Sequence, residues 1–156
     1  MNIFDEYTRD VVIALNKSNV KYLVVGGYAV NFHGYHRTTG DIDLWIEPTD
    51  ENKTKILNAL TLLEIDKDMI QLIATLDFSK PVVFSDGKIP FKIDFMTHVS
   101  HVSFNDAWIK KIDALIDEIP ISFIHLNELV LSKFNTGRLK DKIDIEELER
   151  IQKYKK

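Results

Sequence analysis

Hydrophobic positions follow two spacings along the first third of the chain, one helical and one extended. Apolar residues at helical spacing predict a first helix over 4–17. A short β-branched run predicts a buried strand at 22–25, and a short helix is expected over 28–32. After a polar loop at 36–40, a second strand is expected at 42–46. This part of the chain therefore reads helix, strand, helix, strand.

The rest of the chain predicts more helices and a β-hairpin. Thr49 or Asp50 can cap a helix that reaches about residue 63. Pro120 indicates that its strand lies at a sheet edge or begins at that point. Asp141 is a candidate cap for the last helix, paired with Arg138, and a residue of the functional site is the alternative. The other expected elements are a helix at 69–76, strands at 81–84 and 91–96 joined by a turn at 85–88, a helical turn at 104–109, a strand at 119–124, and helices at 127–135 and 141–154, the last with Ile143, Ile145, Leu148 and Ile151 as core contacts.

This order of elements predicts an α+β fold. We expect a mixed β-sheet with helices packed largely on one face, followed by C-terminal helices. The 156 residues are expected to form a single domain, with a core at about 20–125 and a helical segment at about 126–156. A chain of this length can bury a hydrophobic core without disulfides or structural metals.

Composition and charge narrow the range of partners. The chain is 45% hydrophobic and 28% charged, as in water-soluble globular proteins, and it has no cysteine. No signal peptide or apolar run of about 18 residues is visible, so we expect a cytoplasmic protein without membrane association. The net charge of -4 argues against general binding of duplex DNA. A basic cluster late in the chain could still hold a nucleotide or an RNA end: Lys133, Arg138, Lys140 and Lys142.

Two adjacent glycines, Gly26 and Gly27, end the first strand and lead into a helix. Glycine lets the backbone turn sharply and approach a ligand closely, and free N–H groups at a helix start favour an anion. The pair therefore suggests a phosphate cradle. An ordinary strand-to-helix turn remains the alternative for the glycines taken alone.

Asp41 and Asp43 open the second strand with one residue between them. Side chains two positions apart on a strand point to the same face, so the two carboxylates are expected to project together. Such a pair suits Mg²⁺ or Mn²⁺, with phosphate oxygens completing the coordination. Two solvent-facing acids on an edge strand are the alternative.

Asp94 lies inside another apolar run, at 91–96. A carboxylate in the middle of a strand is costly to bury unless it is paired or metal-bound. If its strand neighbours that of Asp41 and Asp43, the three carboxylates form a cluster that can hold two metal ions. Asp94 could also act as a base toward an acceptor hydroxyl, and an exposed strand face is its alternative.

Taken together, Gly26-Gly27, the Asp41-Ile42-Asp43 triplet and Asp94 resemble the signature of the nucleotidyltransferase superfamily, which includes DNA polymerase β and the tRNA CCA-adding enzymes. A longer string from Gly26 to Leu44 looks more specifically like minimal nucleotidyltransferases close to the abortive-infection AbiEii toxin group. A helix bearing Lys133 and a following Arg-x-Lys-Asp-x-x-Asp turn at 138–144 are also similar to that group. The resemblance spans roughly residues 22–148.

The resemblance implies a metal-dependent nucleotidyltransferase that moves a nucleoside monophosphate from an NTP to a hydroxyl and releases pyrophosphate. In this family Asp41, Asp43 and Asp94 would be the catalytic and metal-binding residues, with Mg²⁺ or Mn²⁺ as the cofactor. The remaining residues would contact the nucleotide and its phosphates: Gly26, Gly27, Arg37, Thr39, Lys133 and Lys140. For Arg37, Lys133 and Lys140, solvated surface charges are the alternative.

The sequence departs from the family in two respects. Gly27 stands where many members carry Ser, which removes a hydroxyl contact to phosphate. The polymerases' further nucleic-acid domains are not expected here, so the acceptor is expected to be a small molecule, an RNA end such as a tRNA, or a protein. A role within a toxin–antitoxin pair follows from the likeness to the AbiEii group, including an antitoxin that modifies a partner toxin. A catalytically inactive module that binds a nucleotide or a partner is the alternative function.

Overall fold

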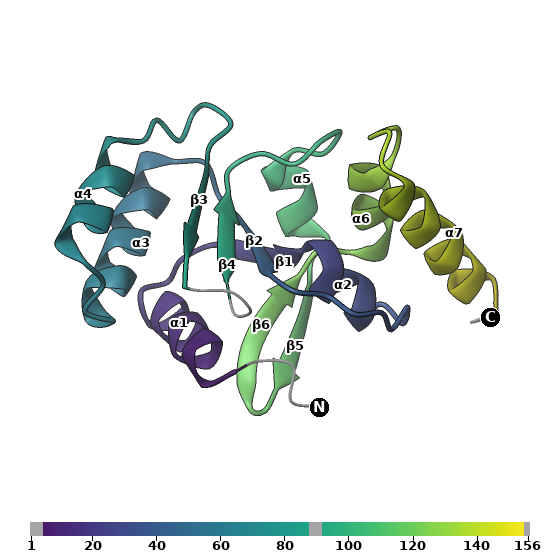
Figure 1. Cartoon of the computed structure of the whole chain (residues 1–156), viewed down its shortest axis with the longest axis horizontal. Coiled ribbons are helices and arrows are strands. Elements are labelled where there is room, and N and C mark those ends of the chain that lie inside the picture. The colour runs from purple at the N-terminus through teal and green to yellow at the C-terminus, as the bar shows by residue number, and fades with distance from the viewer. Residues whose placement is uncertain (1–4, 88–91, 155–156) are drawn as a thin grey trace.

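A computed structural model describes residues 5–87 and 92–154, and its centre is a six-stranded mixed sheet (Figure 1). The strand order is β3-β4-β2-β1-β6-β5. β1 runs antiparallel to β2 and parallel to β6, while β2 runs parallel to β4. The strands are β1 (Tyr22–Val25), β2 (Ile42–Ile46), β3 (Val83–Asp86), β4 (Ile93–Met96), β5 (Ile112–Ile116) and β6 (Ile119–Phe123). The predicted mixed sheet is confirmed.

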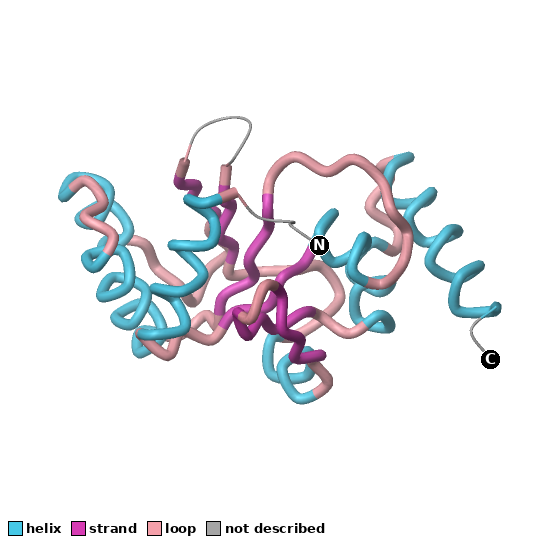
Figure 2. Tube along the Cα trace, turned by 90° about the horizontal axis from the view of Figure 1, so that it is seen from below, coloured by secondary structure: helices cyan, strands magenta, loops and turns pink. Residues whose placement is uncertain are grey.

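Seven helices surround the strands in the described chain, and Figure 2 shows them on both sides of the strands. Thr49 accepts a hydrogen bond from the backbone N–H of Asn52, so it is the predicted N-cap of α3. The α3–α4 pair lies at one end of the molecule and the α6–α7 pair at the other (Figure 1). The helices are α1 (Glu6–Lys17), α2 (Gly26–Phe32), α3 (Asp50–Leu62), α4 (Lys67–Thr75), α5 (Phe104–Ile109), α6 (Leu126–Lys133) and α7 (Leu139–Tyr154).

The core lies against both faces of the central strands, and every residue of β1 is buried. The Tyr22 hydroxyl donates to Asn16 Oδ1 of α1 over 3.0 Å, which puts α1 on the face to which Tyr22 points. Trp45 pairs with Leu23 in the sheet and therefore points to the opposite face. There its ring packs edge-on against that of Phe104 of α5, with 5.2 Å between the ring centroids. α5 thus covers part of the second face of the sheet.

The sequence did not predict β5, the edge strand that pairs with β6. Its alternating residues are half-buried or exposed, so no continuous apolar run marks it. The turn between β5 and β6 uses Asp117 and Glu118, both at positive φ, instead of the glycine that signals a tight hairpin. Pro120 is the second residue of β6, as expected for a strand start, although β6 is not an edge strand.

The start of the last helix also differs from its prediction. α7 begins at Leu139, so Asp141 is inside the helix and is not its N-cap. Ile143 is 40% exposed, whereas Asp141, Asp144 and Leu148 are the buried residues of the helix. The prediction of a core contact is confirmed for Leu148 and wrong for Ile143. The packed face of α7 is occupied by Asp141 and Asp144, which have charged partners, so Ile143 lies on another face.

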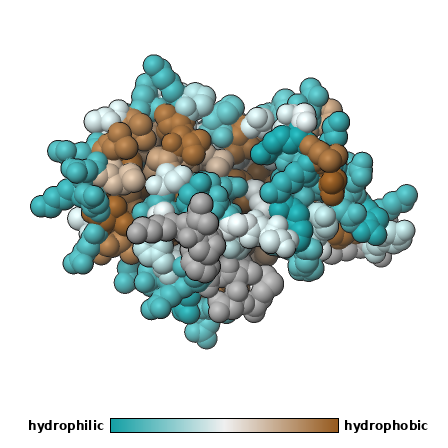
Figure 3. Space-filling model, in the orientation of Figure 1, coloured by the Kyte–Doolittle hydropathy of each residue, from teal (hydrophilic) through white to brown (hydrophobic). Residues whose placement is uncertain are grey.

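Three expected positions, Phe4 in the first helix, Lys88 in the hairpin turn and Phe91 in the strand before Asp94, lie outside the described residues. Among the helices that are described, none has the length and apolar character needed to cross a membrane. Polar side chains dominate the face in Figure 3, with apolar areas near the α3–α4 end and the α6–α7 end. The large hydrophobic side chains most exposed in the described chain are Ile109, Tyr154, Leu115 and Leu139.

Candidate active site

The predicted acids meet because β2 lies between β1 and β4. Asp43 is the register partner of Val25 on β1 and of Asp94 on β4. Neighbouring partners in a sheet point to the same face, so the Asp43 and Asp94 carboxylates lie side by side. Asp41 immediately precedes β2, two residues before Asp43. The structure therefore brings the three predicted carboxylates together at the end of β1 where the glycines begin.

Gly26 has a geometry that requires glycine. Its φ of +66° is in the left-handed region, and a Cβ built on it would lie 2.2 Å from Asp43 Oδ2. Any other residue would meet both backbone strain and a clash with this carboxylate. The turn therefore holds the Asp43 carboxylate directly against the backbone that begins α2.

Gly27 is needed for a different neighbour. A Cβ at this position would lie 2.1 Å from Thr39 Oγ1 and 3.3 Å from the Arg37 guanidinium. The missing side chain leaves room for the Thr39 hydroxyl beside the turn. Many members of the resembled family carry a serine hydroxyl at this position. Here the Thr39 hydroxyl, from the loop before β2, lies close to where the side chain of residue 27 would begin.

The Asp43 carboxylate is poorly solvated and lies among other negative charges. Burial, together with the nearby charges of Asp94 and Asp41, raises the pKa of Asp43 from 3.8 to about 6. The Lys133 ammonium acts in the opposite direction, because it stabilises the charged form. A carboxylate whose pKa is raised by burial and by neighbouring acids is a candidate functional group.

The raised pKa makes stability depend on pH in a testable way. Because the folded pKa of Asp43 lies above its unfolded value, the charged carboxylate opposes folding, and stability should fall as pH rises from about 4 to about 6. In metal-free buffer Asp43→Asn should be more stable than the wild type at pH 8 by up to about 3 kcal/mol, the equivalent of the shift. Denaturant unfolding at pH 4 and pH 8 measures this difference. Asp68→Asn, a control at an exposed position, should show no such change in stability between pH 4 and pH 8. If the effect of Asp43→Asn on stability did not depend on pH, the raised pKa of Asp43 would be contradicted.

Lys92 and Ser85 complete the acid cluster, and the sequence analysis assigned neither of them. Lys92 Nζ lies 3.5 Å from Asp41 Oδ2 and 3.5 Å from Asp94 Oδ1. The Ser85 hydroxyl donates to Asp94 from the register position opposite it on β3. Lys92 precedes Asp94 by two residues, so the strand period alone could have placed it on the same face.

Arg37 and Lys133 both pair with one buried acid, Asp144, which ends the motif at 138–144 but was given no site role from the sequence. Arg37 Nε and NH2 donate to the two Asp144 oxygens at 2.8 and 3.0 Å, and Lys133 Nζ lies 3.0 Å from Asp144 Oδ2. The Asp144 side chain is 0% exposed, and those of Arg37 and Lys133 are 13% and 8% exposed. Neither cation is a solvated surface charge, so that alternative is wrong for both.

Asp141 supports the same cluster. It accepts hydrogen bonds from Thr136 and Arg138, which confirms the expected pairing with Arg138, and it contacts Lys133 at 3.3 Å. Burial tends to raise the pKa of Asp141, but these three partners outweigh it and lower the pKa overall. Burial likewise opposes the charge of Asp144, and Arg37 and Lys133 hold its pKa below 3.8. Lys140 lies exposed in the first turn of α7, outside this network.

The residues at the acid cluster fit a hard divalent cation. Within residues 5–87 and 92–154, no group of three or more His, Cys, Asp or Glu side chains is arranged as a ready metal site. The donor set still matches Mg²⁺ or Mn²⁺, because Asp94 and Asp41 raise the cost of ionising Asp43 and a lysine ammonium already lies between Asp41 and Asp94. A cation at this position would relieve that repulsion.

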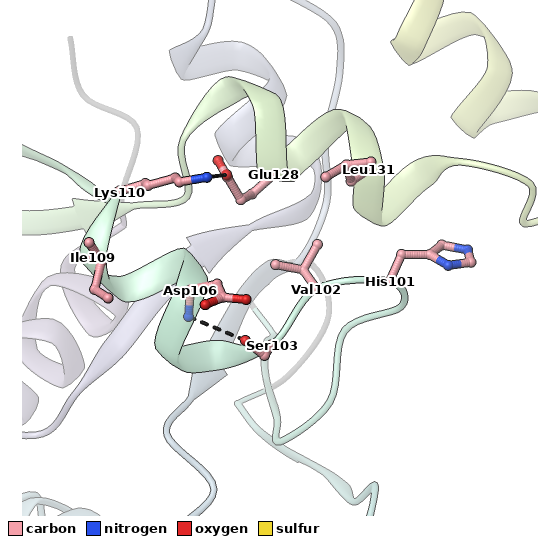
Figure 4. Close-up of a pocket in the computed structure, with 8 residues that line it drawn as sticks. All are labelled: His101, Val102, Ser103, Asp106, Ile109, Lys110, Glu128 and Leu131. Atoms are coloured by element: carbon pink, nitrogen blue, oxygen red, sulfur yellow. Dashed lines mark hydrogen bonds and ion pairs between the residues drawn. The ribbon is translucent and has the colours of Figure 1, made fainter.

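A separate cavity of about 210 Å³ lies between α5 and α6 (Figure 4). Glu128 and Lys110 form an ion pair of 3.1 Å at its side, and the other Glu128 oxygen, Oε2, has no hydrogen-bond partner in the described structure. That oxygen is itself inaccessible to solvent, so a ligand in the cavity does not reach it. None of the residues predicted for nucleotide binding lines this cavity.

Comparisons with known proteins identify a family and similar folds. A family profile described as nucleotidyltransferase of unknown function (DUF6036) matches residues 2–154. The fold resembles that of the lincosamide antibiotic adenylyltransferase LnuA, solved with lincomycin bound, with 15% identity, a TM-score of 0.56, and coverage of 95% of this chain and 98% of that one. It also resembles ANT(2'')-Ia in complex with adenylyl-2''-tobramycin, with 12% identity, a TM-score of 0.55, and coverage of 94% and 93%. No curated protein matched the sequence.

Proposed function

The chain belongs to the family described as nucleotidyltransferase of unknown function (DUF6036), and on that premise we propose that it transfers a nucleoside monophosphate from an NTP to a hydroxyl of a small molecule. One observation carries the proposal: the Asp43 carboxylate lies against the Gly26 turn at the end of β1, with Asp94 as its neighbour on β4. Clustered acids beside an open backbone turn suit a metal-bound triphosphate.

Asp41, Asp43 and Asp94 would hold Mg²⁺ or Mn²⁺ in the working enzyme. The cation would neutralise negative charge on the phosphates and so stabilise the transition state. The raised pKa of Asp43 supports this role, because burial and its acidic neighbours leave that carboxylate short of positive charge.

The triphosphate would lie against the turn at Gly26 and Gly27, beside the Asp43 carboxylate and the Thr39 hydroxyl. The Thr39 hydroxyl beside Gly27 can donate a hydrogen bond to a phosphate oxygen. Arg37 and Lys133 would add positive charge, and Asp144 fixes the position of both. A fixed cation stabilises a phosphate without the entropic cost of ordering a free side chain. Lys140, exposed at the start of α7, could meet a more distant part of the nucleotide.

Asp94 would receive the proton of the acceptor hydroxyl. In the proposed step the acceptor oxygen bonds to the α-phosphorus, the bond from that phosphorus to the bridging oxygen breaks, and pyrophosphate leaves with the electron pair. The Ser85 hydroxyl that donates to Asp94 holds the carboxylate in one orientation. General-base assistance of this kind typically contributes about 10²- to 10⁴-fold in rate.

A small-molecule acceptor is supported by the fold neighbours, which are named for transfer of an adenylyl group to antibiotics. ATP is therefore the first NTP to test, and lincomycin and tobramycin are the first probe acceptors. The magnesium requirement and a closer relation to the AbiEii group belong to the same proposal. A parallel reaction in a chelator should show no transfer, and label on a partner toxin would favour the AbiEii relation.

The deciding experiment supplies each α-labelled NTP and Mg²⁺ together with either a probe acceptor or a cell lysate. We expect label in a small-molecule product and equimolar pyrophosphate. Label in tRNA, in another RNA, or in a protein such as a cognate toxin would replace the proposed acceptor class. NTP binding by calorimetry without any transfer would favour the inactive binding module, and neither binding nor transfer would overturn the proposal.

A further inference from the structure

Lys92 occupies an unusual place for a lysine in this site. Its ammonium lies 3.5 Å from one oxygen of Asp41 and 3.5 Å from one oxygen of Asp94. Both partners are acids that the proposed function assigns to the divalent cation. A unit positive charge therefore already lies between two of the three carboxylates.

The two lysines near the acids differ in how they are held. Lys133 is 8% exposed and is fixed by Asp141 and Asp144 of α7, so it cannot leave without breaking a buried cluster. The Lys92 side chain is 35% exposed, and its ion pairs in the described chain are with Asp41 and Asp94 alone. Its flexible four-carbon stem allows the ammonium to move into solvent when another cation arrives.

We propose that Lys92 is an internal counter-ion that competes with the divalent metal for the acid cluster and is displaced when the metal binds. This inference rests on the proposed function, because it assigns Asp41 and Asp94 to the metal. In the metal-free protein Lys92 offsets the repulsion among the acids. The same contact lowers the affinity of the acid cluster for a free divalent ion. A metal ion that arrives bound to an NTP gains the phosphate contacts as well, so joint loading is favoured.

The test compares Lys92→Met with Lys80→Met by titrating Mn²⁺ into each protein without NTP and following free Mn²⁺ by electron paramagnetic resonance. Lys80 is 75% exposed and pairs only weakly with Asp77, at 4.0 Å, so its variant loses the same charge far from the acids. We expect Lys92→Met to bind Mn²⁺ about five to ten times more tightly than the wild type, as removal of one charge a few ångströms from a divalent ion allows. Lys80→Met should stay within about twofold of the wild type, the range expected for an exposed charge.

A second readout follows thermal unfolding in a chelator at pH 8. Lys92→Met should unfold at a lower temperature than Lys80→Met, because its acids are left unscreened, and saturating Mn²⁺ should close that gap. Binding of Mn²⁺ by the wild type but not by Asp94→Asn would establish that the acids hold the metal. If Lys92→Met then bound Mn²⁺ no more tightly than the wild type, the inference about Lys92 alone would be overturned. Absence of Mn²⁺ binding to both the wild type and Lys92→Met at millimolar concentrations would overturn the metal site itself.

Discussion

Replacing Asp43 with Asn is expected to lower kcat/KM for nucleotidyl transfer by about a thousandfold, the equivalent of about 4 kcal/mol of transition-state stabilisation. Asp43 lies against the Gly26 turn and beside Asp94, so its charge is central to the proposed cation site. Asn keeps the size of the side chain and removes the charge. The assay is the initial rate of label transfer from an α-labelled NTP to the acceptor identified above.

This loss should occur in a protein that is folded and, at pH 8 without metal, more stable than the wild type. That combination separates a catalytic role from a structural one, because a structural residue loses activity together with stability. Asp68→Asn on the exposed side of α4 is the matched control and should keep full activity. The double variant with Asp94→Asn should be little worse than the single one, since residues that act as a unit are not additive. A tenth or more of wild-type activity in Asp43→Asn would contradict the proposed site.

Replacing Asp144 with Asn is expected to destabilise the fold by about 3 to 5 kcal/mol, the usual cost of removing one partner from a buried ion pair. Arg37 would then be buried without its acidic partner, and Lys133 would keep only Asp141, since both cations contact Asp144 within 3.0 Å. For a chain of this size, the change corresponds to a fall in the unfolding temperature of about 10 °C. Denaturant and thermal unfolding measure it directly.

The pH dependence of this deficit gives an independent check. The folded pKa of Asp144 lies below 3.8, so its contribution to stability is present above the unfolded pKa and is lost as pH falls through the folded value. The deficit should therefore be full at pH 7 and shrink in strong acid, the opposite direction to Asp43. Glu149→Gln, on the exposed side of the same helix, should change stability by less than about 0.5 kcal/mol. A similarly small effect of Asp144→Asn at pH 7 would show that the cluster does not hold α7 in place.

Together the two variants separate two layers of the site. The acids at Gly26 carry the proposed chemistry and are destabilising when charged, whereas Asp144 stabilises the fold and places two cations beside the glycine turn. Arg37 precedes β2 and Lys133 ends α6, so a single buried carboxylate joins segments that are almost 100 residues apart in the chain.

Much of the fold and the acid cluster could be predicted from the chain itself. Extended runs bounded by glycine and proline marked β1, β2 and β6, and helical spacing with Thr49 as cap marked α3. The period of a strand placed Asp41 and Asp43 on one face, because that relation is local. A lone Asp94 inside an apolar run was predicted to join them, and β4 does pair with β2. Local patterns also missed β5, whose edge position leaves it half-exposed and whose turn lacks glycine.

The tertiary structure alone decided which charges are buried together. From the sequence, Asp144 ended the motif at 138–144 without an assigned role, Asp141 was a candidate cap or site residue, and Arg37 and Lys133 could equally have been solvated. Their pairing depends on how α7 packs beside α6 and the loop before β2, and such long-range contacts leave no periodic pattern in the chain. The place of the Thr39 hydroxyl beside Gly27, and of Lys92 between two acids, was likewise set by contacts between segments. The sequence by itself determined the elements and the acids, because both depend on neighbours a few residues away, and only packing determined which cations meet those acids.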